Sequence, residues 1–440
     1  MERKFEQELL GWKSAVPRKP LVVVGARQIG KTTTIKAFGK SAFARCIHAD
    51  LYKRPELRTA FAANLEPRAI ITTLSAILRE DIDPAHDLLF LDEIQESPEA
   101  LASLKYFATD MPELAVVAAG STLGVQIARK GASFPVGYVD MRRMNPMDFE
   151  EFCWAMGDRR AYELVRNSLQ AMSACPIHEM MMGRYREYLL VGGMPEAVLR
   201  WVQTSSLETV RKVQDDIRMG YVADMAKYAE NVDAVKIVAC WESIPAQLAK
   251  ESGSTKFVWK EISARAKAET HRSAIDWLAA ARVIDRVTKV ECMEAPLKTF
   301  EQDGSFKVYL ADTGLLSAAY EATPADLAGK GPRTARFRGG LAENYIAQQL
   351  TAAGIPHYYW GMESRSEVEF VVGLSDGVVP IEVKSGENVR SVSLAKACDK
   401  YACPMAIRIS AKNFGYENGI LCLPLYAAGL VGEYREDLGI

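Results

Sequence analysis

The sequence lacks the features of a membrane protein, a secreted protein and a disulfide-rich protein. No stretch of its 440 residues approaches the roughly 18 consecutive apolar residues of a membrane span. Residues 1–13 are charged throughout and contain no apolar core of a secretory signal. The eight cysteines form no CxxC pair, which favours reduced thiols over disulfides or a metal site. We therefore expect a cytoplasmic protein with no membrane partner.

The sequence also has little net charge. The total of −2 gives no overall attraction to nucleic acid, although a local basic face is compatible with it. Hydrophobic residues make up 49% and charged residues 25%, which is the ordinary composition of globular proteins. A chain of 440 residues is too long for one compact core, so about two to four domains are expected.

A nucleotide site is predicted at residues 21–34. Four apolar residues, 21–24, predict a buried strand, and GARQIGKT after them fits the phosphate-binding pattern GxxxxGK[ST] at every fixed position. A chance match is the alternative, but the strand before the motif and the helix predicted after it argue for the functional interpretation. The residues expected to bind ATP are Gly25, Ala26, Arg27, Gln28, Ile29, Gly30, Lys31, Thr32 and Thr33. Lys31 would contact the β- and γ-phosphates, and the Thr32 hydroxyl would ligate Mg²⁺.

A second motif follows about 60 residues later. Residues 87–94, DLLFLDEI, form an apolar strand that ends in two carboxylates. Asp92 suits a ligand of Mg²⁺ or its water, and Glu93 suits the base that polarises the attacking water. A strand that ends in Asp-Glu is by itself only a solvated strand end. Its position after the phosphate-binding motif favours the catalytic interpretation.

A third apolar strand, residues 114–119, leads into Gly120, Ser121 and Thr122. Ser121 at this strand end could contact the γ-phosphate or the water, as sensor residues do. Serine and threonine also favour the N-cap of a helix. The sequence leaves both roles open.

Longer phrases follow in a fixed order and identify a family resemblance. They are FPVG (134–137), MNPMDFEEF (144–152), YLLVGGMPE (188–196), IPAQL (244–248), FKVYLADTGLL (306–316), GLAEN (340–344) and IEVKS (381–385). With the nucleotide motifs, this ordered set resembles the prokaryotic extended AAA ATPases, a family with a C-terminal domain of unknown function. The resemblance covers nearly the whole chain.

The resemblance implies an α/β protein with four parts. These are an AAA P-loop core (1–150), a helical lid (151–235), a winged helix (236–300) and an α/β restriction-endonuclease-like domain (301–440). It also implies hydrolysis of ATP with Mg²⁺, a hexameric ring of identical subunits, and action on DNA, including branched DNA.

One position departs from the family pattern. A basic residue commonly follows the phrase FPVG, whereas this chain has Tyr138. Arg129, Arg142 and Arg143 are nearby candidates for an arginine finger, which supplies positive charge to the departing phosphoryl group. An ordinary solvated surface position is the alternative for each of them.

Residues 236–290 predict short helices followed by a β-wing. Ile244-Pro245 is expected to open a turn, residues 257–262 to begin a second helix, residues 269–281 to form an amphipathic helix, and residues 283–290 to form a strand. Residues 254–290 carry eight Lys or Arg against four Asp or Glu, a local excess of positive charge. The expected DNA contacts are Arg265, Lys267, His271 and Arg272. Packing between subunits, with solvated lysines, is the alternative.

Residues 367–384 predict a β-hairpin with a turn at 375–377. Residues two apart on a strand share a face, so Glu367 and Glu369 project together, as do Glu382 and Lys384. This pattern resembles the PD-(D/E)XK nucleases, in which carboxylates hold Mg²⁺ and the lysine positions hydroxide. Glu343, on the preceding predicted helix, matches a further carboxylate of such sites, and Glu369 stands where the family usually has Asp. The nuclease-like set is therefore Glu343, Glu369, Glu382 and Lys384; a polar hairpin face without cleavage is the alternative.

Taken together, these motifs predict an oligomeric ATPase that remodels or translocates DNA, with branch migration of junctions as one such activity. The alternative is a regulatory nucleotide switch in a defence or toxin-control complex. A metabolic kinase does not fit, because no small-substrate signature is present and the C-terminal half would have no role.

Overall fold

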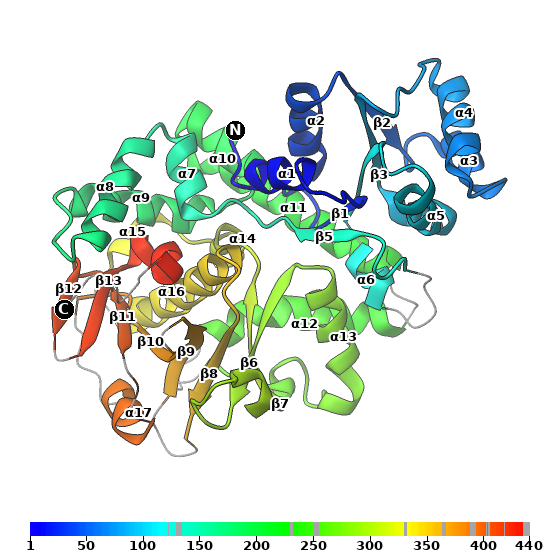
Figure 1. Cartoon of the computed structure of the whole chain (residues 1–440). Coiled ribbons are helices and arrows are strands. Elements are labelled where there is room, and N and C mark those ends of the chain that lie inside the picture. Colours follow the sequence, from blue (N-terminus) through cyan, green and yellow to red (C-terminus); the bar gives the residue numbers. More distant parts are fainter. Residues whose placement is uncertain are drawn as a thin grey trace. The chain divides into compact units, whose positions relative to one another are not determined.

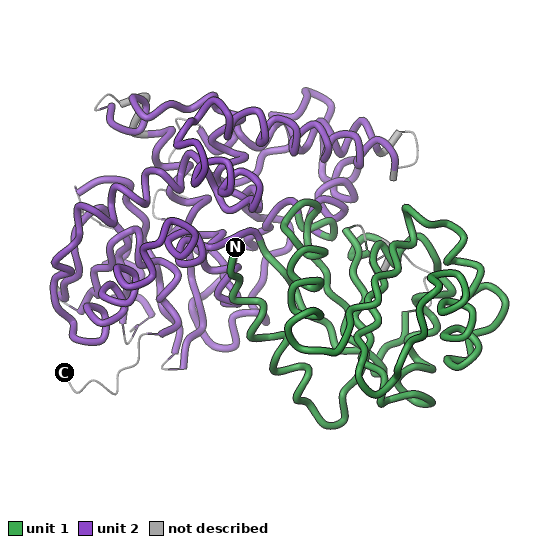
Figure 2. The backbone as a smooth tube through the Cα atoms, turned by 90° about the horizontal axis from the view of Figure 1, so that it is seen from above, with its two compact units in different colours: residues 1–145, 280–282 green, residues 146–279, 283–440 purple. Residues whose placement is uncertain are grey.

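The computed structural model describes residues 1–121, 123–128, 134–228, 232–249, 255–329, 332–362, 367–375, 377–387, 393–401, 403, 405–417 and 419–433. The chain divides into two compact units (Figure 2). Unit 1 consists of residues 1–145 and 280–282, and unit 2 of residues 146–279 and 283–440. None of the helices within these described ranges is long and apolar enough to cross a membrane. The fold is α/β, with one sheet in each unit.

Unit 1 is built on a parallel sheet (Figure 1). Its described strands are β1 (Leu21–Val24), β2 (Arg45–Asp50), β3 (Asp87–Asp92), β4 (Ala115–Gly120) and β5 (Asp140–Arg143), in the order β2-β3-β4-β1-β5. Every neighbouring pair runs parallel. The strands predicted at 21–24, 87–94 and 114–119 are confirmed as β1, β3 and β4, although β3 ends at Asp92. Strands buried on both faces appear in a sequence as continuous apolar runs.

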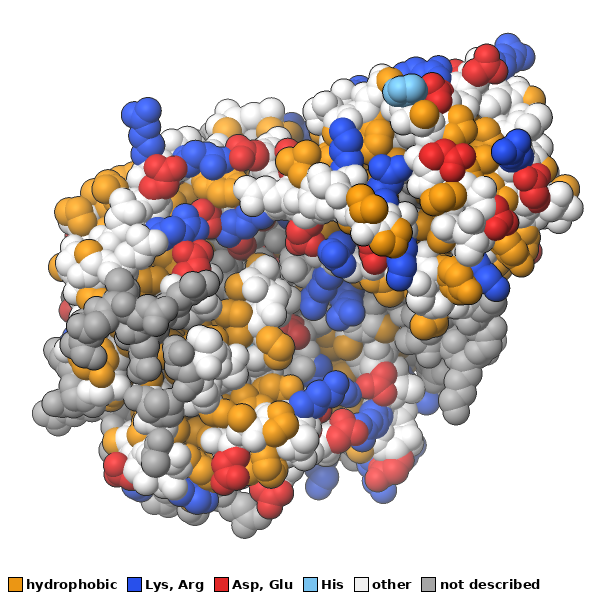
Figure 3. Space-filling model, in the orientation of Figure 1, with side chains coloured by type: hydrophobic (Ala, Val, Ile, Leu, Met, Phe, Trp, Pro, Cys, Tyr) orange, Lys and Arg blue, Asp and Glu red, His pale blue; other side chains and the backbone are white. Residues whose placement is uncertain are grey.

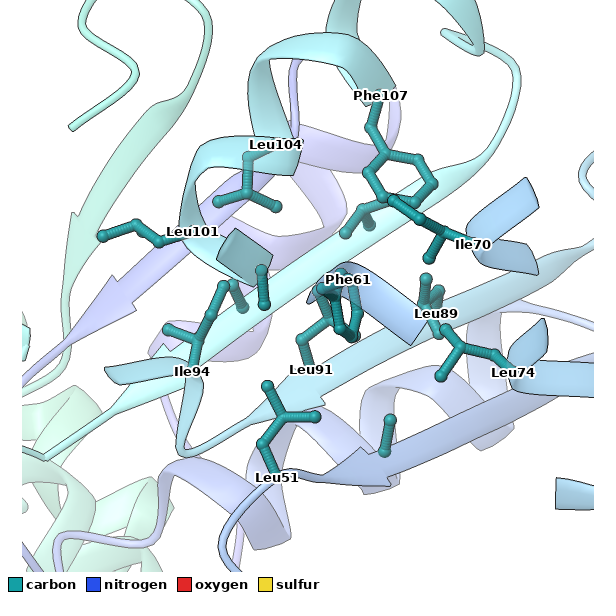
Figure 4. Packing of buried hydrophobic residues seen from close by; sticks show 14 of the residues in the cluster. Leu51, Phe61, Ile70, Leu74, Leu89, Leu91, Ile94, Leu101, Leu104 and Phe107 are labelled. Carbon is teal, nitrogen blue, oxygen red and sulfur yellow. The ribbon is translucent and has the colours of Figure 1, made fainter. Parts of the chain in front are cut away.

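Helices cover both faces of this sheet and supply its hydrophobic core. They are α1 (Phe5–Lys13), α2 (Lys31–Ala42), α3 (Thr59–Ala62), α4 (Pro67–Leu78), α5 (Pro98–Asp110) and α6 (Leu123–Ala128). Figure 4 shows Leu89 and Leu91 of β3 facing Phe61 of α3, with Leu74 of α4 and Leu104 of α5 around them. All five side chains are buried, so β3 is held in place by packing on this face.

Unit 2 contains a mixed sheet. Its described strands are β6 (Ile284–Val290), β7 (Glu301–Leu310), β8 (His357–Gly361), β9 (Glu367–Leu374), β10 (Gly377–Val383), β11 (Ala406–Ser410), β12 (Gly415–Glu417) and β13 (Ile420–Pro424). The order is β12-β13-β11-β10-β9-β8-β6-β7. β6 pairs antiparallel with β7 and parallel with β8, so the strand predicted as part of a wing belongs to the same sheet as the C-terminal hairpin. The hairpin itself is confirmed as β9 and β10, whereas Asp376 of its turn lies outside the described residues.

The described helices of unit 2 come from distant segments of the chain, and some of them meet in an aromatic cluster. They are α7 (Phe149–Ala155), α8 (Arg159–Gln170), α9 (His178–Val191), α10 (Pro195–Thr204), α11 (Leu207–Tyr228), α12 (Val232–Leu248), α13 (Ala268–Ala280), α14 (Thr313–Ala319), α15 (Pro324–Ala328), α16 (Pro332–Ala352) and α17 (Ser393–Tyr401). The ring of Tyr345 on α16 lies 6.2 Å from that of Phe149 on α7 and 5.6 Å from that of Tyr188 on α9. The four-part domain division stays a prediction, and the parts expected at 151–235 and 301–440 share this aromatic packing.

Two local predictions in the middle of the chain are wrong. Pro245 does not open a turn but lies inside α12. A proline there removes one backbone donor, while Ile244 and Leu248 beside it are buried and hold the helix in place. Residues 257–262 form only a short 3₁₀ helix, Trp259–Glu261, instead of beginning a longer helix. The helix predicted at 269–281 is confirmed as α13.

A buried carboxylate joins two of the phrases that carry the family resemblance, 188–196 and 306–316. Asp312 accepts hydrogen bonds from the Gly193 amide (2.6 Å), from the Leu315 amide at the start of α14 (3.0 Å) and from Gln348 Nε2 on α16 (3.2 Å). Gly193 allows no larger residue here, since a Cβ atom would overlap the Met147 carbonyl oxygen. Burial raises the pKa of Asp312 to about 6, although the hydrogen bonds from these backbone amides oppose the shift.

This raised pKa predicts a pH dependence of stability. A carboxyl whose folded-state pKa lies above its unfolded value contributes stability that is complete below the unfolded pKa and is lost as the pH rises through the folded pKa. With values of 3.8 and about 6, Asp312 should lower the free energy of unfolding by ~2 kcal/mol between about pH 4.5 and about pH 7.5. Denaturant titration of Asp312→Asn at both pH values should lack this component.

Asp326→Asn is the matched control. The Asp326 carboxyl is exposed, and hydrogen bonds from Thr323 lower its pKa, so its removal should not reduce the loss of stability with rising pH. Equal pH dependence in wild type and Asp312→Asn would show that Asp312 ionises as freely in the folded state as in the unfolded chain.

Candidate functional site

The loop between β1 and α2 has the backbone that a phosphate-binding loop requires. Gly30 precedes the first residue of α2 with φ of 90°, a left-handed conformation that favours glycine. Gly25 lies so close to the Met144 carbonyl oxygen that a Cβ atom would overlap it. Residues 25–30 therefore form the loop, and Lys31, Thr32 and Thr33 form the first turn of α2, whose free amides provide a site for anions.

The Lys31 ammonium is held at this loop. Its Nζ donates to the carbonyl oxygens of Gly25 (2.9 Å) and Ala26 (2.7 Å), and the residue is only 8% exposed. Burial lowers the pKa of Lys31 to about 8, and the charges of Glu93 and Asp92 oppose this shift. Phosphate oxygens would offer charged acceptors in place of two neutral carbonyls, which favours binding of a polyphosphate here.

Thr32 and Asp92, the two predicted metal ligands, meet directly. The Thr32 hydroxyl donates to Asp92 Oδ2 at 2.8 Å, across 60 residues of sequence. The Asp92 carboxylate is buried at the end of β3. A hydroxyl and a carboxylate beside a phosphate-binding loop are oxygen ligands of the kind that Mg²⁺ prefers, so these residues fit that ion.

His48 and Asp50 of β2 also face this point, which sequence reasoning missed. His48 Nε2 lies 3.2 Å from Asp92 Oδ2, and the parallel register of β2 and β3 pairs Asp50 with Asp92. Ligand atoms of these three residues lie within 4.8 Å of one another. The available sequence signal was Asp50, a polar residue at the end of a strand. It could not be assigned to this site without the knowledge that β2 lies next to β3.

Glu93, the predicted base, is held by two neighbours. It adopts a left-handed backbone conformation (φ 51°), which turns the chain sharply after β3. Its Oε2 accepts a short hydrogen bond from Gln95 Nε2 and a longer one from Ser121 Oγ at 3.4 Å. Ser121 is thus brought into the site, and its role as sensor stays a prediction; Thr122 lies outside the described residues. Gln95 was missed, because only the turn after β3 directs it back toward Glu93.

Two of the three arginine-finger candidates are described. Arg142 Nε lies 3.7 Å from Glu8 Oε2 of α1, and Arg142 Nη1 donates a hydrogen bond to the Met141 carbonyl oxygen. Arg143 lies on the same strand, β5. Arg129 lies outside the described residues. The identity of the finger therefore stays a prediction.

The four predicted DNA contacts differ in their surroundings. Arg265 and Lys267 are exposed just before α13. Arg272 is paired with Asp303, and His271 Nδ1 lies 2.8 Å from the Thr270 hydroxyl. The first two are therefore better placed for contact with phosphate groups than the second two. On the face shown in Figure 3, basic and acidic side chains are interspersed.

The four nuclease-like residues lie near one another in unit 2. Lys384 Nζ is 3.1 Å from Glu382 Oε1 and 3.9 Å from Glu369 Oε1. Glu343 on α16 accepts hydrogen bonds from Thr255 and Tyr309. Burial raises the pKa of Glu369 to about 7; the charge of Lys384 opposes this shift and that of Glu343 adds to it.

Three family models match parts of the chain. Residues 17–153 match the model described as an AAA domain. Residues 182–326 match a domain of unknown function (DUF8612), and residues 338–428 match another (DUF4143). No curated protein matches the sequence.

Solved structures with similar chains have low sequence identity to this one. A Walker-type ATPase of Pyrococcus abyssi is 15% identical, with 72% of this chain and 95% of that chain covered and a TM-score of 0.44. The ORC1 protein of Aeropyrum pernix, solved with DNA, is 12% identical, with 72% and 91% covered and a TM-score of 0.29. A signal transduction ATPase with numerous domains from Pyrococcus horikoshii is 13% identical, with 80% and 45% covered and a TM-score of 0.27.

The AAA match coincides with the unit 1 sheet, the phosphate-binding loop and the Thr32–Asp92 contact. The chain therefore carries an AAA-type P-loop domain at residues 17–153, followed by two regions that match families of unknown function.

Proposed function

We propose that this chain is an ATPase that hydrolyses ATP with Mg²⁺ at the carboxyl edge of the unit 1 sheet. The observation that carries the proposal is the hydrogen bond between Thr32 and Asp92 beside the phosphate-binding loop, with Glu93 as the next residue. Candidates for the phosphate-binding groups, the Mg²⁺ ligands and the general base lie at this edge.

The residues at this edge have different roles in ATP hydrolysis. The amides of residues 25–33 and the Lys31 ammonium bind the β- and γ-phosphates and hold them in one orientation. Bound Mg²⁺ would supply positive charge to the phosphate oxygens. Glu93 takes the proton of the attacking water as general base. Ser121 and Gln95 orient the Glu93 carboxylate through their hydrogen bonds.

We further propose that ATP turnover drives action on DNA by a ring of identical subunits. In this proposal residues 151–235 form the helical lid, residues 236–300 a winged helix, and residues 301–440 a restriction-endonuclease-like domain. Support comes from the exposed Arg265 and Lys267 and from the excess of basic residues between 254 and 290. Remodelling or translocation of DNA, including branch migration of junctions, fits a ring with such a basic element.

A regulatory nucleotide switch is the second candidate. The observation that favours it is the pair of hydrogen bonds from the Lys31 ammonium to the Gly25 and Ala26 carbonyl oxygens. Lys31 must exchange these bonds for bonds to phosphate oxygens before hydrolysis, which suits slow turnover. Sedimentation with ATP separates the candidates: a ring with DNA-stimulated turnover supports the motor, and a monomer with negligible turnover supports the switch.

Substitutions of Glu93 and Lys31 should separate hydrolysis from binding. Glu93→Gln removes the general base, so phosphate release should fall by about 10²–10⁴-fold while ATP affinity changes little. Lys31→Ala removes a charge-assisted hydrogen bond to phosphate, so ATP affinity should fall by at least ~10-fold. Steady-state phosphate release and titration with a fluorescent ATP analogue measure the two effects.

Glu96→Gln is the matched control for Glu93→Gln. Its carboxylate lies in the same turn but pairs with Arg58 Nη2 at 3.5 Å, away from Glu93. Its turnover should stay close to that of the wild type. Equal turnover in Glu93→Gln and wild type would refute the assignment of Glu93 as the base.

The DNA proposal predicts a change in salt dependence. Replacing Arg265 and Lys267 together by alanine should weaken binding to forked and four-way DNA and lower the slope of log K against log salt by about 2. Lys212→Ala, at an exposed lysine of α11 paired with Glu208, should leave the slope unchanged. Fluorescence anisotropy over a range of salt concentrations gives both slopes. If wild type binds no linear, forked or four-way DNA with or without ATP, the DNA proposal falls and the switch remains.

A further inference from the structure

A lysine side chain lies among the carboxylates of the nuclease-like region. The carboxylate cluster consists of Glu343, Glu367, Glu369 and Glu382. Lys307 of β7 places its Nζ 2.6 Å from Glu367 Oε1 and 3.5 Å from Glu343 Oε2. Its side chain is 0% exposed. One ammonium thus bridges carboxylates from two elements, the strand β9 and the helix α16.

The surroundings keep Lys307 charged although it is buried. Burial opposes the charged form of a lysine, but the ion pairs of Lys307 with Glu367 at 2.6 Å and with Glu343 at 3.5 Å favour it. A neutral amine would leave two partly buried carboxylates, Glu343 and Glu367, without this counter-charge, at a cost in free energy. Lys307 is therefore a fixed positive charge inside the cluster.

Two further cationic side chains, Arg408 and Lys384, pair with Glu382 of the cluster. Arg408 Nε lies 3.2 Å from Glu382 Oε2, and Lys384 Nζ lies 3.1 Å from the other oxygen, Oε1. The Glu343 Oε2 oxygen also accepts from the Thr255 and Tyr309 hydroxyls, at 2.7 Å and 2.9 Å. Four carboxylates thus face three cations.

A divalent ion would have little to gain at this cluster. Mg²⁺ and Mn²⁺ bind where several oxygen ligands carry uncompensated negative charge. Here an ammonium already bridges Glu343 and Glu367, and an incoming ion would have to displace or repel it. The nuclease-like pattern on the hairpin is therefore accompanied by the Lys307 ammonium, which supplies positive charge where a nuclease would hold a metal ion.

We propose that Lys307 is a built-in cation that occupies the carboxylate cluster in place of a divalent metal. Residues 301–440 accordingly hold a latent metal site, and this region contributes DNA binding or packing without cleavage of DNA. Removal of the Lys307 charge converts the cluster into a site for Mn²⁺. The inference concerns unit 2 alone and stands or falls independently of ATP hydrolysis.

Replacement of Lys307 by methionine, which is similar in length but uncharged, tests the proposal. All proteins carry Asp92→Asn, so that metal bound beside the phosphate-binding loop does not contribute. Mn²⁺ binding is measured by electron paramagnetic resonance of the free ion and by calorimetry, without nucleotide. Lys307→Met should bind Mn²⁺ at least roughly 100-fold more tightly than the parent, since one buried positive charge next to the ion is gone. Glu367→Gln in the Lys307→Met protein should abolish this gain.

Lys298→Met, at an exposed lysine of the same unit, is the control for loss of one positive charge and should not bind Mn²⁺ more tightly. The proposal is overturned if the parent protein itself binds one Mn²⁺ that Glu369→Gln releases. It is equally overturned if folded Lys307→Met gains no affinity. If Lys307→Met alone does not fold, the double variant Lys307→Met with Glu343→Gln is used, because it has one carboxylate fewer without a counter-charge. Recovery of the fold of this double variant on addition of Mn²⁺ supports the proposal. No effect of Mn²⁺ on its folding contradicts the proposal.

Discussion

The hydrogen bond between the Thr32 hydroxyl and the Asp92 carboxylate is the contact on which the proposed ATP site depends. It joins the first turn of α2 to the end of β3, so the phosphate-binding loop and the residues that follow β3 are held at one point. Parallel pairing of β1 with β4 and of β4 with β3 brings all three strand ends to the same edge of the sheet. Lys31, Glu93 and Ser121 reach that edge because their strands do. The hydrophobic core on one face of the sheet keeps these ends in register (Figure 4).

Much of unit 1 could be predicted from sequence because its strands are buried on both faces. Such strands appear as unbroken apolar runs, and the motif residues follow them directly. His48 and Gln95 could not be predicted. Their contacts with Asp92 and Glu93 depend on which strand lies beside β3 and on how the chain turns after it. Pro245 was misjudged for a related reason: local preference indicates a turn, whereas burial of its neighbours keeps α12 helical.

In unit 2 the sequence predicted which hairpin residues lie close together, but it did not predict which charged side chains are buried among them. The hairpin pattern brought Glu369, Glu382 and Lys384 together, and a polar strand pattern is enough to predict that. Lys307 comes from an edge strand of the sheet, and only the fold reveals that its ammonium enters the cluster. Asp312 is a similar case, because its desolvation and its bond to the Gly193 amide arise from packing between distant segments. Buried charge depends on tertiary packing, so a sequence pattern alone leaves its role open.

Calorimetric titration of the folded wild-type protein with ATP and Mg²⁺ tests the central claim most directly. Backbone amides, the Lys31 ammonium and the Thr32–Asp92 pair should together bind the triphosphate, giving saturable heat with one ATP per chain and a marked loss of affinity when Mg²⁺ is removed. Absence of any binding heat from protein shown to be folded would contradict the account, because both the motor and the switch require an occupied nucleotide site.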